Sequence, residues 1–134
     1  MNKTIKVSNA ELLGFVIPAF IKMKESVLPT RVSYKVIKTL ASCTMAGADY
    51  DKERFEIIEQ KCKKDENGKP VFDEKNNYLF DSDEISNSVY TEIEGLLKRE
   101  VEVVVYPISI EDIPDVSLQT SVLESLIKMN LITE

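Results

Sequence analysis

Residues 30–62 read TRVSYKVIKTLASCTMAGADYDKERFEIIEQKC, and they carry the longest helical pattern in the chain. Thr30 or Ser33 is a suitable N-cap, because a hydroxyl oxygen accepts a hydrogen bond from a free amide of the first helical turn. Gly47 is expected to bend or break the helix near its middle, since glycine costs about 1 kcal/mol relative to alanine. Apolar side chains recur mostly at three- and four-residue steps, which makes one stripe along the helix: Ile37, Ala41, Met45, Ala48, Phe55, Ile58 and Cys62.

The segment before this helix predicts a short strand and a first helix. Residues 3–7 alternate polar and apolar side chains, as an edge strand does. Ser8 and Glu11 match the capping-box pattern, so a helix is expected from there to about Lys24, with a kink at Pro18. Its apolar residues go most of the way round, so this helix is either central in a monomer or shared in a homodimer, and both alternatives stay open.

The segment after the long helix predicts a hairpin, two more helices and a strand. Residues 61–84 are polar and rich in turn signals, which favours a small β-hairpin projecting from the helical body. A helix over about residues 84–99 follows, and Ser82 or Asp83 is its expected cap. Residues 100–108 are the richest in β-branched side chains and predict a strand that pairs with residues 5–7. Ser117 is the expected cap of a last helix, and no internal repeat is apparent.

Together these patterns predict an α+β fold that is mostly helical, with one long helix, a small antiparallel sheet and a β-hairpin. The chain has 134 residues, a length that fits a single domain. We therefore expect one domain over residues 1–134, with residues 61–84 as a hairpin protrusion.

The residue types present exclude the most familiar catalytic sites. Histidine is absent, which removes the Ser-His-Asp and Cys-His arrangements and the commonest general base. The four glycines form no phosphate-binding loop. Cys43 and Cys62 lie 19 residues apart on one expected helix, which is about 28 Å and too far for a disulfide. We predict free thiols in a reducing compartment, no enzymatic activity, no cofactor and no metal.

The charge balance restricts the partners. The formal net charge is −6, from 17 basic and 23 acidic side chains, and such a surface repels nucleic-acid phosphates and anionic membranes. No stretch is apolar and long enough to span a bilayer. One short cluster of cations contains an aromatic residue, and it consists of Arg31, Lys35, Lys38 and Tyr34. This cluster is only weak evidence for nucleic-acid binding, and a solvated helix face is the simpler interpretation. Neither membrane nor nucleic acid is expected as a partner, and a basic protein surface is the natural complement.

The candidate binding surface is the hairpin. A two-stranded hairpin is marginal alone, so Phe72, Tyr78 and Phe80 must pack on the body or on a partner. Carboxylates gather around these aromatic side chains, and they are Asp65, Glu66, Asp73, Glu74 and Asp81. The alternatives are a solvated face, an acidic projection that docks on a basic surface, and a carboxylate site for a metal. A calcium loop is disfavoured, because Lys63 stands where the first carboxylate ligand should be.

Three segments carry a resemblance to a family. The long helix starts Leu-Pro-Thr-Arg-Val-Ser-Tyr at residues 28–34, an Asp-Glu-Asn-Gly turn follows at residues 65–68, and residues 96–103 read Leu-Leu-Lys-Arg-Glu-Val-Glu-Val. In these segments the chain resembles uncharacterised small proteins from phages and prophages of Gram-positive bacteria. The resemblance spans most of the chain and implies a phage-derived protein acting in the cytoplasm of a bacterial host.

Three functional hypotheses follow from the charge, the residue types and the resemblance. The first is a non-catalytic accessory protein that binds and modulates, by inhibition, a host or phage protein of replication, transcription or defence. The second is a structural or assembly subunit of a phage particle. The third is an enzyme that uses carboxylates and a divalent metal. The identity of the target is open in each case.

Overall fold

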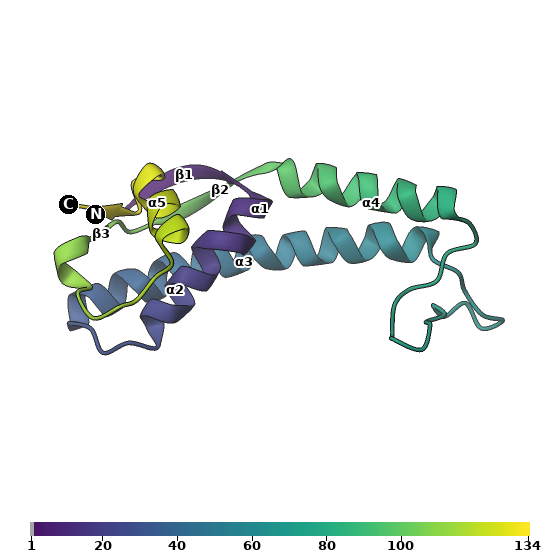
Figure 1. The fold of residues 1–134 in the computed structure, drawn as a ribbon, viewed down its shortest axis with the longest axis horizontal. Coiled ribbons are helices and arrows are strands. Elements are labelled where there is room, and N and C mark those ends of the chain that lie inside the picture. The colour runs from purple at the N-terminus through teal and green to yellow at the C-terminus, as the bar shows by residue number, and fades with distance from the viewer. Residues whose placement is uncertain (1) are drawn as a thin grey trace. The chain divides into compact units, whose positions relative to one another are not determined.

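The computed structural model describes residues 2–134. In chain order the elements are β1 (Lys3–Ser8), α1 (Asn9–Glu11), the π-helical turn η1 (Leu12–Val16), α2 (Ile17–Lys24), α3 (Thr30–Lys61), α4 (Asp83–Lys98), β2 (Glu100–Val105), β3 (Ile108–Ser109), the 3-10 turn η2 (Ile110–Asp112), α5 (Thr120–Lys128) and β4 (Ile132–Thr133) (Figure 1). This composition confirms a mostly helical α+β fold with one long helix and a small antiparallel sheet.

The chain divides into two compact units. The first contains the chain up to Ala48 together with Glu100–Glu134, and the second is Asp49–Arg99. Helix α3 contributes its residues up to Ala48 to the first unit and the rest to the second. The single domain expected over the whole chain stays a prediction.

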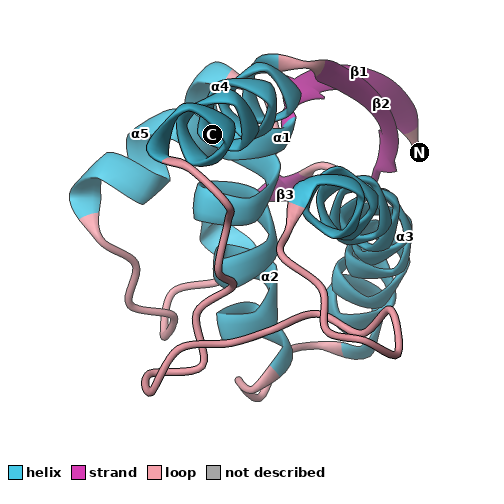
Figure 2. Ribbon diagram, turned by 90° about the vertical axis from the view of Figure 1, so that its right-hand side faces the viewer, coloured by secondary structure: helices cyan, strands magenta, loops and turns pink. Residues whose placement is uncertain are grey.

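The first unit contains the antiparallel pair of β1 and β2, which curve side by side in Figure 2. Lys3 pairs with Val105 and Ser8 with Glu100, so the predicted pairing of residues 5–7 with the β-branched strand is confirmed. The edge of β2 that does not pair with β1 donates hydrogen bonds to two hydroxyl groups of α3. The N–H of Val104 donates to the Ser42 hydroxyl at 2.9 Å, and the N–H of Tyr106 donates to the Thr39 hydroxyl at 2.8 Å.

The first helical segment starts and ends where the sequence predicts. The Ser8 hydroxyl accepts from the N–H of Glu11 at 3.1 Å, and the Glu11 carboxylate accepts from the N–H of Ser8 at 3.1 Å, which completes the capping box. Pro18 stands in the first turn of α2 and has no N–H to donate to a carbonyl of the preceding turn. The irregularity expected at this proline takes the form of the π-helical turn η1 directly before it.

Helix α3 passes through Gly47 without a break. A Cβ atom at this position would lie 3.2 Å from Cδ1 of Ile17 and 3.6 Å from Cδ2 of Leu13. The glycine therefore allows η1 and α2 to approach α3 closely, and the predicted break was wrong because packing supports the helix there.

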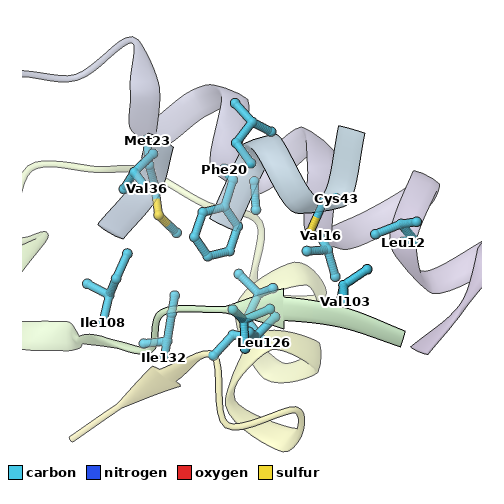
Figure 3. Packing of buried hydrophobic residues seen from close by; sticks show 14 of the residues in the cluster. Leu12, Val16, Phe20, Met23, Val36, Cys43, Val103, Ile108, Leu126 and Ile132 are labelled. Carbon is cyan, nitrogen blue, oxygen red and sulfur yellow. The ribbon is translucent and has the colours of Figure 1, made fainter. Parts of the chain in front are cut away.

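The core of the first unit is built from the early helices, α3, the strands and α5. Phe20 lies among the labelled side chains of Figure 3 and is fully buried. Side chains of the first helical segment lie in this cluster, so the segment is central in its unit, and the question of a homodimer stays open. Its largest fully buried members are Leu12, Phe20, Met23, Ile108, Leu126, Leu131 and Ile132.

The C-terminal part differs from the prediction at two points. Helix α5 begins at Thr120 with Gln119 as its N-cap, so the cap expected at Ser117 was wrong. Ile108 and Ser109 pair in parallel with Ile132 and Thr133, an arrangement the sequence analysis did not anticipate.

The apolar stripe predicted on α3 is mostly solvent-exposed. An apolar stripe on a helix usually faces the core, yet only Ile58 and Cys62 of the seven residues named for it are buried. The buried face of the helix within the first unit is a different one, carrying Val32, Val36, Leu40 and Cys43. Two apolar stripes therefore run along α3, and spacing alone selected the exposed one.

The second unit packs α4 against the last part of α3. Ser82 caps α4, as expected, by accepting from the N–H of Ile85 at 3.2 Å. Its buried cluster consists of Ile58, Cys62 and Val89, with Ile57, Tyr78, Phe80 and Ile93 packed against it. Two ion pairs, Lys61–Glu92 at 2.7 Å and Arg99–Glu53 at 2.6 Å, lie at its surface.

Candidate protein-binding surface

The loop between α3 and α4 is built from an eight-residue repeat. Residues 65–72 read DENGKPVF and residues 73–80 read DEKNNYLF, so Asp, Glu and Phe recur at the first, second and eighth positions. This repeat was not predicted from the sequence, because the positions between its shared residues differ.

Both copies fold as the same Asp-anchored turn. The Asp65 carboxylate accepts from the N–H of Asn67 at 2.8 Å and of Lys69 at 3.0 Å. The Asp73 carboxylate accepts from the N–H of Lys75 at 2.8 Å and of Asn77 at 2.9 Å. The fourth position of each copy has a positive φ, 76° at Gly68 and 62° at Asn76, which glycine and asparagine tolerate best.

A ring of three backbone hydrogen bonds ties the two turns together. The N–H of Val71 donates to the carbonyl of Lys63 at 2.9 Å, that of Leu79 to Val71 at 3.0 Å, and that of Lys63 to Leu79 at 2.7 Å. These three residues are spaced by eight, so the ring follows from the repeat. The predicted hairpin is thus realised as two turns with single bridges, Lys64–Pro70 and Phe72–Tyr78, rather than as two continuous strands.

The eight predicted site residues separate into two groups. Asp65 and Asp73 hold the turns, while Tyr78 and Phe80 pack against the buried cluster of the second unit. The other four, Glu66, Phe72, Glu74 and Asp81, are exposed and have neither of these roles, while Asp65 and Asp73 are exposed as well. The Phe72 side chain is 47% exposed, although its ring centroid lies 4.8 Å from that of Tyr78.

Beside this loop the second unit has an aromatic groove of about 420 Å³. Tyr90 on α4 is exposed, and it lines the groove together with Tyr78 and Phe80. The complete lining is Arg54, Ile58, Asn76, Asn77, Tyr78, Phe80, Val89, Tyr90 and Ile93. Sequence reasoning missed Arg54 and Tyr90 as site residues. The available signal was Tyr90 itself, an aromatic residue off the apolar stripe of its helix.

The charge of the loop is mixed rather than acidic. Exposed lysines alternate with the carboxylates along residues 63–75: Lys63, Lys64, Lys69 and Lys75. The loop therefore offers hydrogen-bond donors and both signs of charge around Phe72, and a uniformly basic partner is not required.

The turn at Asp73 gives the loop a pH dependence. The N–H of Asn77 holds the pKa of the Asp73 carboxyl below its ordinary value of 3.8. Desolvation opposes this lowering of the pKa, and smaller contributions from the N–H of Lys75 and the side chain of Asn77 add to it. A lowered folded-state pKa adds stability that is present above the ordinary value and is lost as pH falls through the folded one. We expect the Asp73 turn to open at that acidic pH.

An NMR titration of the Asp73 carboxyl carbon measures this effect, and its midpoint should fall below 3.8. Asp73→Asn is the matched control, since its amide oxygen still accepts hydrogen bonds but does not titrate. A midpoint at or above the ordinary value would contradict the assignment of the turn.

The two cysteine thiols lie in the buried clusters of their units. Cys43 and Cys62 are free and buried. Burial raises the pKa of the Cys43 thiol to about 11, so at neutral pH it stays protonated and is a poor nucleophile. Within the described part of the chain no group of three or more Cys, Asp or Glu side chains is placed to hold a metal ion. None of the helices in residues 2–134 is both long and apolar enough to cross a bilayer.

Comparison with protein-family models, curated proteins and solved structures gives no match to this chain.

Proposed function

We propose that this chain is a non-catalytic accessory protein that binds another protein through the aromatic groove and the exposed Phe72. The observation that carries the proposal is the exposure of Phe72 on a loop that is otherwise fixed. Aromatic side chains dominate the binding energy of protein interfaces, and a surface that is ordered before binding loses less entropy when it binds.

The order of the loop has an identifiable origin. The two Asp-anchored turns and the ring through Lys63, Val71 and Leu79 fix its backbone. Tyr78 and Phe80 attach it to the buried cluster of the second unit. The ring of Phe72, at the end of the first repeat, lies beside the Tyr78 ring, and its side chain is still about half exposed. The loop therefore holds one large apolar side chain toward solvent at a defined position.

The lining of the aromatic groove indicates the kind of partner. Arg54 supplies a cation, and the amides of Asn76 and Asn77 can donate to or accept from a peptide backbone. Tyr90 and Phe80 supply apolar area. This mixture suits a protein segment with one apolar side chain and polar flanks. The resemblance to phage and prophage proteins supports a host protein in the bacterial cytoplasm, of replication, transcription or defence, as the target, with inhibition as the outcome.

The test is affinity capture from a bacterial lysate with wild-type protein and with Phe72→Ala, followed by quantitation of each captured protein. Because truncation of a central aromatic anchor costs about 2 kcal/mol or more, we expect the retained partner to bind about 30-fold more weakly or worse. Circular dichroism should show an intact fold, since Phe72 is half-exposed.

The matched control is Phe55→Ala, which removes a ring of similar exposure, 50%, that does not line the groove. Capture should be unchanged by this variant. Equal retention of every captured protein by Phe72→Ala and Phe55→Ala would refute the proposed surface. Phe80→Ala is unsuitable as a first variant, because Phe80 packs against the buried cluster and its loss perturbs the loop.

A further inference from the structure

One face of α3 carries a row of apolar side chains that are exposed to solvent. Ile37 is 56% exposed and Met45 is 73% exposed, and Ala41 and Ala48 lie between and beyond them on the same face. Met45 is thus more exposed than any residue of the opposite face, where Val36 and Cys43 are in the core. Exposed apolar rows of this kind mark surfaces that another molecule covers.

The row is not flat. A depression of about 300 Å³ adjoins it, lined by Ile37, Ala41, Leu40, Thr44 and Lys24. The alanines leave space above the helix, so a second helix can approach closely and place larger side chains over them. The surface therefore fits a helix better than it fits a loop or an extended peptide.

The charges along α3 are separated in sequence. From Ser26 to Ala48 the chain has no acidic residue and carries Arg31, Lys35 and Lys38, whereas Asp49 and Asp51 follow directly. Lys38 and Asp49 are 11 residues apart, about three helical turns, so they lie on the same flank of the exposed face. Both side chains are exposed. A helix with cations before the apolar row and anions after it is complementary to an antiparallel copy of itself.

We propose that a second copy of this chain covers the face, with the two α3 helices antiparallel across a two-fold axis. Met45 of each copy lies over Ala41 of the other, where the small side chain leaves room. In this register Lys38 of each copy lies beside Asp49 of the other, and the two-fold repeats the pair. Apolar contact supplies the affinity, and the ion pairs fix the register.

The charge arrangement favours a copy of this chain over another occupant. An unrelated acidic helix would complement Lys38, but it would leave the carboxylate of Asp49 facing an acidic flank. A copy satisfies both ends at once. The homodimer deduced in this way uses α3, and not the first helix, which is central in its unit.

Sedimentation equilibrium of the full chain tests the proposal over a wide range of protein concentration. We expect a reversible monomer–dimer equilibrium for the wild type and a monomer for Met45→Glu. Val27→Glu is the matched control, since Val27 is 99% exposed and lies before α3, and it should dimerise like the wild type. Circular dichroism should be unchanged in both variants, because neither position is buried.

The charge pair provides a second, independent readout. Each single variant, Lys38→Glu or Asp49→Lys, places two like charges side by side in both symmetry-related pairs of the dimer. Each should therefore weaken dimerisation about tenfold or more. The double variant Lys38→Glu with Asp49→Lys should recover most of the wild-type dissociation constant. Three outcomes would overturn the proposal: a wild type that stays monomeric at every concentration, open-ended assemblies larger than a dimer, or a double variant no tighter than the weaker single one. A monomeric wild type that captures an acidic helical protein through Met45 would assign the face to that partner instead.

Discussion

Replacing Phe20 by alanine is expected to lower the free energy of unfolding by about 3–5 kcal/mol. The ring is fully buried in the core of the first unit, among side chains from α2, α3, the strands and α5. Truncation removes its transfer free energy and leaves a cavity that elements tied together on every side cannot fill. Domains of this size are stable by roughly 5–15 kcal/mol, so the loss is a large part of the total.

Urea denaturation followed by circular dichroism measures this loss as a lower midpoint with a similar slope. Ile21→Ala is the matched control, because Ile21 is the next residue of α2 and is 43% exposed. It should change stability by a small fraction of the Phe20 effect. Similar losses of stability at the two positions would mean that α2 does not bury Phe20 and expose Ile21 in the way described.

The features predicted correctly depend on local chemistry. The capping box of Ser8 and Glu11 and the Ser82 cap need only neighbouring residues, and both are present. The pairing of residues 5–7 with the β-branched strand was also predictable, because few other segments of the chain are rich in strand-forming side chains.

The orientation of α3 was not predictable from spacing. Val32, Val36, Leu40 and Cys43 recur at the same steps as the stripe that contains Ile37, so both faces satisfy the helical period. Which face is buried depends on where η1, α2 and β2 lie, and periodicity contains no information on that. Two hydroxyl side chains of α3 do indicate its orientation, because Thr39 and Ser42 lie on the side of the helix that contacts β2.

The structure gives the predicted binding residues of the segment 61–84 different roles, and their use in binding stays a prediction. The segment 61–84 does contain Phe72 and the turns, yet half of the named residues turn out to hold the loop together. A carboxylate that begins an Asp-x-Asn-Gly turn often accepts from the following amides, so Asp65 gave a signal of a structural role. The ring of hydrogen bonds and the part of the groove contributed by Arg54 and Tyr90 are tertiary features that no single segment specifies.

Thr39→Val is expected to lower the free energy of unfolding by about 1–3 kcal/mol, although the volume of the side chain hardly changes. The Thr39 hydroxyl is fully buried on α3 and accepts from the N–H of Tyr106 at 2.8 Å. Valine offers no acceptor, so the N–H of Tyr106 is left without its partner beside a fully buried position of α3. An unpaired buried amide costs more than an average hydrogen bond contributes, since its hydration is lost without replacement.

Thr39→Ser separates this effect from packing, because it keeps the acceptor and removes only a methyl group. Urea denaturation should rank wild type above the serine variant and the serine variant above valine. Amide hydrogen exchange gives the site-specific readout, with the Tyr106 N–H exchanging faster in the valine variant while Val104, which donates to Ser42, keeps its protection. If valine is as stable as threonine, water or another acceptor satisfies the Tyr106 amide. The stability of this strand edge then does not depend on α3, and the hydroxyls of α3 do not determine how that helix is aligned with β2.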